Sequence, residues 1–172
     1  GGAPLFSINR GMDDNHKANT ILNTSFSMVC ASSILLMLVG LIFSKPLLIL
    51  FGASKNALIY ARPYMMIYLL GTLPAMISTG MNPFINAQGY STTGMFSVVI
   101  GAVANIILDP LFIFMLGLGV NGAAIATVIS QILSAAFVFY FLRRKAELKV
   151  RLLRKNELHS CLSIAKNIIT LG

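Results

Sequence analysis

The sequence predicts an all-α polytopic membrane protein. Of its 172 residues, 56% are hydrophobic and only 10% are charged, and the mean hydropathy is +0.81. Soluble domains carry about 25% charged residues, and a water-soluble chain this apolar would expose large apolar patches and aggregate. Long uncharged stretches alternate with short polar breaks along the chain. We therefore expect four complete transmembrane helices plus parts of two more.

The first complete span is expected near the start of the chain. No charge occurs from Ala18 to Ser44, which is long enough because a crossing takes roughly 20 apolar residues. We place the helix at about Thr20–Phe43. Lys45-Pro46 should end it, because proline lacks the N–H that a helix needs. The run Leu47–Phe51 that follows is too short to cross and predicts a brief interfacial turn of helix.

Three further spans are expected between Arg62 and Arg143. The 80 residues between them hold one charge, Asp109, and are too many for two crossings. Two uncharged breaks, at 86–94 and 117–122, are rich in the glycine and polar residues that favour turns. They divide the region into helices at about Ala57–Asn86, Thr93–Leu116 and Asn121–Leu142.

The second of the four spans contains residues that interrupt helices: Gly71, Pro74, Gly80 and Pro83. Broken helices are frequent in transporters, because non-helical backbone is tolerated where it lines a cavity. Proline is also frequent in ordinary spanning helices. The pattern therefore fits both a cavity-lining helix and a plain one.

Positive charge gathers after the last span. The net charge is +8, and seven of the 13 Lys and Arg residues lie between Arg143 and Lys155. Such clusters beside an apolar helix mark the cytoplasmic side, whereas nucleic-acid binding needs basic side chains spread over a folded face. We expect the lipid bilayer and no nucleic acid as partner. The predicted division is a transmembrane bundle at 1–142, a basic cytoplasmic loop at 143–160 and the start of another helix at 161–172.

Asp109 is the first candidate functional residue. A carboxylate at a helix centre costs about 2.5–3.5 kcal/mol on insertion scales, so such residues usually face a protein interior and often mark ion paths. Asn105 lies one turn earlier on the same face, and Pro110 should free the carbonyl of Ile106 and kink the helix. Together they suggest a proton or cation site. The alternatives are a protonated Asp109 that bonds helices together and a Pro110 that only shapes its helix.

The two last spans form a predicted hairpin that brings in more polar residues. Asp109 and Thr127 are each nine residues from Leu118 at the turn, and Asn105 and Gln131 are each thirteen away. Equal separation predicts equal depth. At 1.5 Å per residue, Asp109 lies about 10 Å below the outer end of its helix.

Other residues suggest less. Tyr68 and Tyr64 share a helix face and could either reach the polar site or anchor the span at the interface. The two histidines, His16 and His159, lie in polar loops away from Asp109. No nucleophile with a base partner, phosphate loop or metal-ligand cluster is present. We expect neither an enzyme nor a cofactor.

Several strings resemble the multidrug and toxic compound extrusion (MATE) family. Asn105–Phe114 (NIILDPLFIF) resembles its fifth helix, and Gly122–Gln131 (GAAIATVISQ) resembles its sixth. Phe84–Gly89 (FINAQG) and Arg10-Gly11, with Ala18 after a short polar loop, also match. The resemblance extends over nearly the whole chain.

This resemblance implies twelve helices in two six-helix lobes that alternate between inward-facing and outward-facing states. The chain would run from the end of helix two to the start of helix seven, without the first helix and the C-terminal lobe. It implies export of cationic or amphipathic compounds across the plasma membrane, driven by inward H⁺ or Na⁺. The cation-binding positions of the family match Asn105, Asp109 and Thr127, which could bind Na⁺. Gln131 and Tyr68 are the possible auxiliary polar residues.

Two other functions remain open. A lipid-linked oligosaccharide flippase of the same superfamily would need basic residues to hold an anionic pyrophosphate, and the stretch between Arg62 and Arg143 contains no Lys or Arg. A non-transporting membrane scaffold would have no need of a costly intramembrane Asp109.

Overall fold

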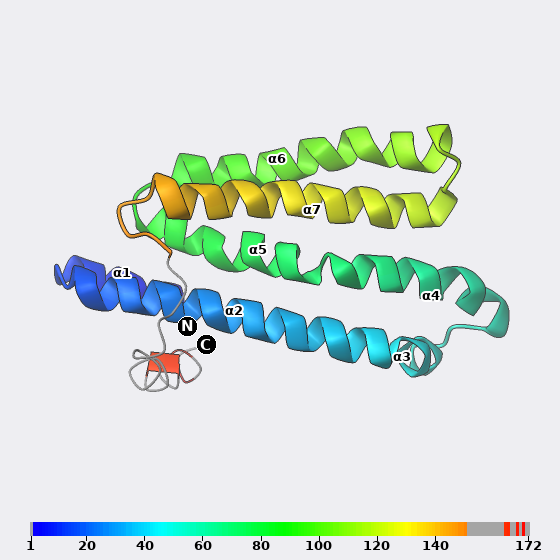
Figure 1. The fold of residues 1–172 in the computed structure, drawn as a ribbon, viewed down its shortest axis with the longest axis horizontal. Helices are drawn as coiled ribbons and strands as arrows, with labels where there is room; N and C mark the ends of the chain where they lie inside the picture. Colours follow the sequence, from blue (N-terminus) through cyan, green and yellow to red (C-terminus); the bar gives the residue numbers. More distant parts are fainter. Residues whose placement is uncertain (1, 151–163, 166–167, 169, 171–172) are drawn as a thin grey trace.

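A computed structural model describes residues 2–150, 164–165, 168 and 170. The described chain consists of helices joined by short turns, and the non-helical residues 145–150 follow the last long helix (Figure 1). The elements are α1 (Gly2–Gly11), α2 (Asn15–Ile42), α3 (Ser44–Leu50), α4 (Lys55–Leu70), α5 (Thr72–Ala87), α6 (Ser91–Pro110), the π-helix η1 (Leu111–Met115) and α7 (Gly119–Arg144).

The long helices lie side by side and run alternately up and down the bundle (Figure 1). Helix α7 packs against α4, α5 and α6, and α5 also contacts α1 and α2. One end of the bundle holds the α1–α2 turn, the α5–α6 turn and the C-terminus of α7, and we call it the basic end. The other holds α3 and the turn between η1 and α7, and we call it the hairpin end.

The all-α polytopic fold is confirmed. In the described part of the chain, three helices are long and apolar enough to cross a membrane: α2, α6 with η1, and α7. Helices α4 and α5 meet the same test only as a pair, which is bent by 47°. The expected four spans are therefore reached if that bent pair crosses as one.

Helix boundaries differ from the predicted ones where polar residues cap the ends. Helix α2 begins at Asn15 rather than Thr20, because the Asp14 carboxylate accepts the Lys17 backbone N–H at 3.0 Å and caps the first turn. The expected interfacial turn is the short helix α3, which includes Pro46 in its first turn. Helix α7 runs two residues past the expected bundle limit of 142.

The expected interruption of the second span occurs at one place. Helix α4 ends before Gly71 and α5 starts after it, whereas Pro63 and Pro83 lie inside continuous helices. Gly71 is buried, and a Cβ there would come within 2.6 Å of Gln131 Oε1 and 2.9 Å of Val128 Cγ2. The break therefore presses directly on α7.

Apolar packing is concentrated at the basic end, where α1, α2, α5 and α7 meet. Phe6 packs edge-on against Phe84 with ring centroids 5.4 Å apart, and Tyr90 against Phe141 at 5.1 Å. The segment after α7 joins this core through Ala146 and Val150. Of the predicted loop at 143–160, only this first part is described. The predicted helix start at 161–172 lies almost wholly outside the described residues.

Candidate cation site

The helix that carries Asp109 changes its hydrogen bonding at Pro110. Helix α6 ends at Pro110 and continues as the π-helix η1, in which the Leu116 backbone N–H bonds to the Leu111 carbonyl at 3.0 Å. Proline cannot donate to the preceding turn, so a shift to wider spacing at this point is physically reasonable. The change falls directly after Asp109.

The three predicted site residues come together. The Asn105 side-chain amide Nδ2 donates to Asp109 Oδ1 at 3.2 Å and to Thr127 Oγ1 at 3.4 Å. The Thr127 hydroxyl in turn donates to the Ala123 carbonyl at 2.9 Å. All three side chains are half-buried. Asn105 is therefore the centre of the group, linking the acid on its own helix to the hydroxyl on α7.

The pairing across the hairpin is offset from the simple residue count. Counting from Leu118 places Asp109 level with Thr127, but the hydrogen bond reaches Thr127 from Asn105, one turn deeper. A π-helix puts more residues into each turn than an α-helix and so rises less per residue. The five residues of η1 therefore draw the more distant part of α6 toward the hairpin end.

A cavity of about 330 Å³, lined by both apolar and polar side chains, lies beside this group, between α5, α6 and α7. Asn105, Thr127 and Gln131 line one part of it, so Gln131 lies near the group and its auxiliary role stays a prediction. The remaining polar side chains of the lining are Ser78, Thr79, Ser130 and Ser134. A cavity with this many polar groups suits water or a hydrated ion.

Serine and asparagine residues that the sequence did not single out hold the walls of this cavity together. Ser134 on α7 donates to the Ser97 carbonyl at 2.7 Å and contacts Ser78 Oγ at 2.6 Å. Asn82 donates to the Gly94 carbonyl at 2.8 Å and to Ser97 Oγ at 2.7 Å. Small residues and hydroxyls commonly join membrane helices, but each of these residues looks ordinary in isolation. The sequence does not show that these residues lie at a common depth on three helices, so it could not predict their contacts.

Tyr68 does not join the site. Its ring stacks on Tyr64 with centroids 6.0 Å apart, and its side chain is 43% exposed. The residues that line the cavity do not include it. This arrangement fits the interfacial alternative better than the auxiliary role.

The turn that supports the site requires a glycine. A Cβ at Gly122 on α7 would lie 2.6 Å from the Phe112 carbonyl oxygen of η1. Main-chain atoms cannot move aside as a flexible side chain can, so only glycine allows this approach. Gly122 thereby fixes η1, and with it the position of Asp109, against α7.

Chemically, the group offers one carboxylate, one amide and one hydroxyl on two packed helices. Their oxygens are the ligands that hard cations such as Na⁺ prefer, and the same carboxylate can take up a proton. Within the described residues, no cluster of three or more His, Cys, Asp or Glu side chains could hold a metal ion. The arrangement suits reversible binding of a monovalent cation or proton.

A family model described as MatE matches residues 1–111, well over half of the chain. The chain belongs to the MatE family. Its solved relatives are described as MATE transporters and not as enzymes.

Curated relatives agree with this assignment. Protein DETOXIFICATION 43 of Arabidopsis thaliana is 40% identical over 111 residues, which are 63% of this chain and 21% of that protein. Multidrug export protein MepA of Staphylococcus haemolyticus is 29% identical over 147 residues, covering 86% of this chain and 32% of MepA. The chain thus spans about a fifth to a third of the length of these relatives.

Solved MATE structures share the fold. A MATE protein in the bent conformation superposes with a TM-score of 0.84 at 24% identity, over 95% of this chain and 38% of that one. The outward-facing conformation of a multidrug resistance MATE family transporter gives a TM-score of 0.82 at 25% identity, over 94% of this chain and 37% of that one. The bent α4–α5 pair and the π-helical end of α6 therefore belong to a multi-pass membrane fold.

Proposed function

We propose that this chain is most of the N-terminal lobe of a cation-coupled exporter, and that Asn105, Asp109 and Thr127 bind the coupling H⁺ or Na⁺. The main supporting observation is the Asn105 amide, which bonds to both Asp109 and Thr127 beside a cavity that Asn105, Thr127 and Gln131 line. Ionisable residues inside a membrane are costly and commonly mark ion or substrate paths, which supports a binding role for Asp109. Alternating access by two lobes is proposed from membership of the family.

The proposed substrates are cationic or amphipathic small molecules, because relatives such as MepA are named as multidrug export proteins. The partners would be the bilayer, the first helix and the C-terminal lobe of the full-length protein. We place the protein in the plasma membrane with the basic end in the cytoplasm. The support is the excess of Lys and Arg after α7.

The full-length protein in liposomes tests this proposal through dye efflux under an imposed H⁺ or Na⁺ gradient. We expect Asp109→Asn to lower gradient-driven efflux by at least about a hundredfold, because the neutral side chain cannot exchange a charge. Whichever gradient drives efflux in the unmodified protein identifies the coupling ion.

Asp13→Asn is the matched control, because it makes the same chemical change at an exposed turn between α1 and α2. Asp13 has a φ of 59°, which asparagine also tolerates. Asp13→Asn should transport normally. Gradient-driven efflux by Asp109→Asn at the rate of this control would refute the coupling role. No efflux with either gradient in the unmodified protein would favour a flippase or scaffold.

A further inference from the structure

The six residues after α7, 145–150, form a strap that lies against the basic end. Ala146 and Val150 are 2% and 5% exposed, and Leu148 is partly buried against the same core. Lys145, Glu147 and Lys149 alternate with them and are exposed. Buried and exposed side chains thus alternate along the strap, while its backbone turns at Lys145 and bends through residues 146–148. The strap is therefore packed onto the lobe and follows its surface.

The strap also completes the hydrogen bonding of α7. The backbone N–H groups of Lys145 and Ala146 both bond to the Phe141 carbonyl at 2.9 Å, and that of Val150 bonds to the Leu142 carbonyl at 3.1 Å. The last carbonyls of a helix have no partner within the helix. The strap supplies partners for two of them.

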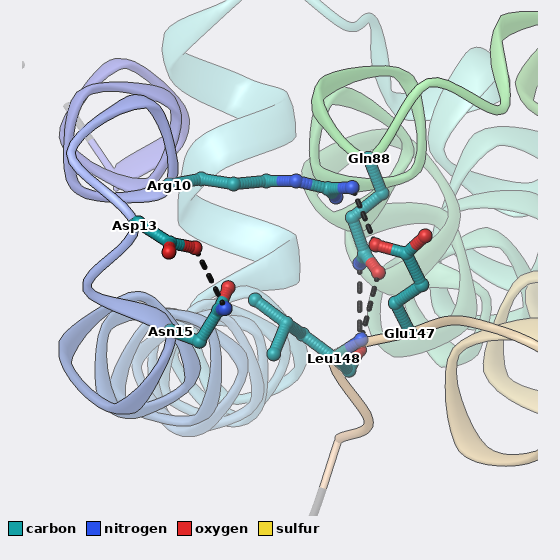
Figure 2. Close-up of polar contacts among 6 residues, drawn as sticks. All are labelled: Arg10, Asp13, Asn15, Gln88, Glu147 and Leu148. Atoms are coloured by element: carbon teal, nitrogen blue, oxygen red, sulfur yellow. Dashed lines mark hydrogen bonds and ion pairs between the residues drawn. The ribbon is translucent and has the colours of Figure 1, made fainter.

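Gln88 at the end of α5 holds the middle of the strap. The Leu148 backbone N–H donates to Gln88 Oε1 at 3.0 Å, and Gln88 Nε2 donates to the Leu148 carbonyl at 3.4 Å (Figure 2). One side chain thus satisfies both main-chain groups of Leu148, as a neighbouring β-strand would. Gln88 is only 4% exposed, so these bonds form away from solvent.

A third helix is tied in by an ion pair. Arg10, in the last turn of α1, reaches across the turn region to Glu147, with Nη2 and Oε2 2.5 Å apart (Figure 2). The Arg10 and Glu147 side chains are 25% and 61% exposed. Exposed ion pairs contribute little energy. The Arg10–Glu147 pair therefore orients the strap, and Gln88 and the buried strap residues stabilise its packing on the lobe.

We propose that Gln88 is a positioning residue that fastens the strap to the lobe, so that residues 145–150 move with the lobe as one body. This role rests on the proposed two-lobe transport. Released from Gln88, the six residues of the strap could extend by up to about 20 Å. The movement of one lobe would then be transmitted less directly to the other.

Hydrogen exchange in the full-length protein tests the contact itself. Gln88→Met keeps the length of the side chain and removes both of its hydrogen-bonding groups. We expect the Leu148 amide to exchange about tenfold faster in this variant, while amides in the middle of α7 keep their protection. Lys149→Met is the matched control, since its exposed side chain points away from the strap contact. Equal protection of Leu148 in Gln88→Met and the unmodified protein would overturn the proposal.

Charge exchange gives a second, independent variant set. Arg10→Glu and Glu147→Arg should each speed exchange at the Leu148 amide by less than about threefold, because the pair is exposed. The two changes together should restore the original rate. Failure of the double variant to recover would show that Arg10 does not act through Glu147.

Transport measurements distinguish a positioning role for Gln88 from an effect on protein stability alone. We expect Gln88→Met to lower gradient-driven efflux at least about threefold, since lobe movement limits turnover in many transport and catalytic cycles, with cation binding to the purified protein unchanged. Normal efflux despite a released strap, or loss of cation binding, would overturn the positioning role. If Asp109→Asn also transports normally, the coupling proposal fails. The hydrogen-exchange measurement still tests the Gln88–Leu148 contact independently.

Discussion

At the basic end, side chains from α1, α2, α5 and α7 form one continuous apolar core, whereas α4 and η1 near the hairpin end contribute no buried side chain. The half with the candidate site instead depends on glycine contacts and on hydroxyl and amide hydrogen bonds. The difference indicates a division of labour. One end is fixed by apolar packing, and the other retains polar groups and space for an ion.

The largest expected effect is on the packed end. Phe84→Ala removes a ring that is 3% exposed and packs on Phe6. Phe→Ala in a core costs about 3–5 kcal/mol, and we expect the lower limit here because lipid already removes part of the hydrophobic driving force. Thermal unfolding of the full-length protein in detergent measures it. Phe96→Ala, at a 52% exposed position on α6, is the control and should unfold nearly as the unmodified protein does.

Gly122→Ala should have the next largest effect and should fall on the site half. The new methyl group would meet the Phe112 carbonyl and displace η1 from α7, at a cost of about 1–3 kcal/mol. Cation affinity should fall with stability, because η1 directly follows Asp109. Gly11→Ala is the control, since a Cβ there has open space around it. Normal cation affinity in Gly122→Ala would show that ion binding does not depend on the position of η1.

Thr127→Val tests the polar contact across the hairpin. It removes the acceptor of the Asn105 amide while keeping the branched shape, and such bonds in membranes contribute about 0.6–1.7 kcal/mol. We expect cation affinity to fall more than stability, and Thr127→Ser to restore most of it. Isothermal titration of the full-length protein with Na⁺ or H⁺ measures the change. Equal affinities for the valine and serine variants would exclude the hydroxyl as a ligand.

The smallest effect is expected at Tyr68. Tyr68→Phe removes a hydroxyl that lies away from the cavity and keeps the stacking on Tyr64. Cation affinity and efflux should change by less than about twofold, because the ring supplies the contact. Gln131→Leu, within the cavity lining, makes the comparison. A larger loss for Tyr68→Phe than for Gln131→Leu would reverse the assignment of auxiliary residues.

Much of the fold could be predicted because membrane helices follow hydropathy and length. The site was also accessible, since Asp109 is the single charge in its 80 residues and Asn105 follows from helical spacing. What could not be predicted depends on tertiary contact. The break at Gly71, rather than at a proline, is where α4 and α5 press on Gln131, and the offset of Thr127 follows from the π-helix.

The strap was missed for a related reason. Half of residues 145–150 are charged, and the sequence predicted them as part of a basic cytoplasmic loop. Only Gln88, sixty residues earlier in the chain, gives Leu148 its hydrogen-bond partners. Local pattern carries no information about such a pairing.

The strap also determines where the polypeptide can be divided for engineering. A chain break after Val150 leaves Ala146 and Val150 in the core, whereas a break after Arg144 removes both and leaves the buried Gln88 amide without Leu148. Two separately expressed halves should therefore assemble better when joined or split beyond Val150. A reporter domain inserted there would be joined to the packed strap, and its orientation would follow that of the lobe.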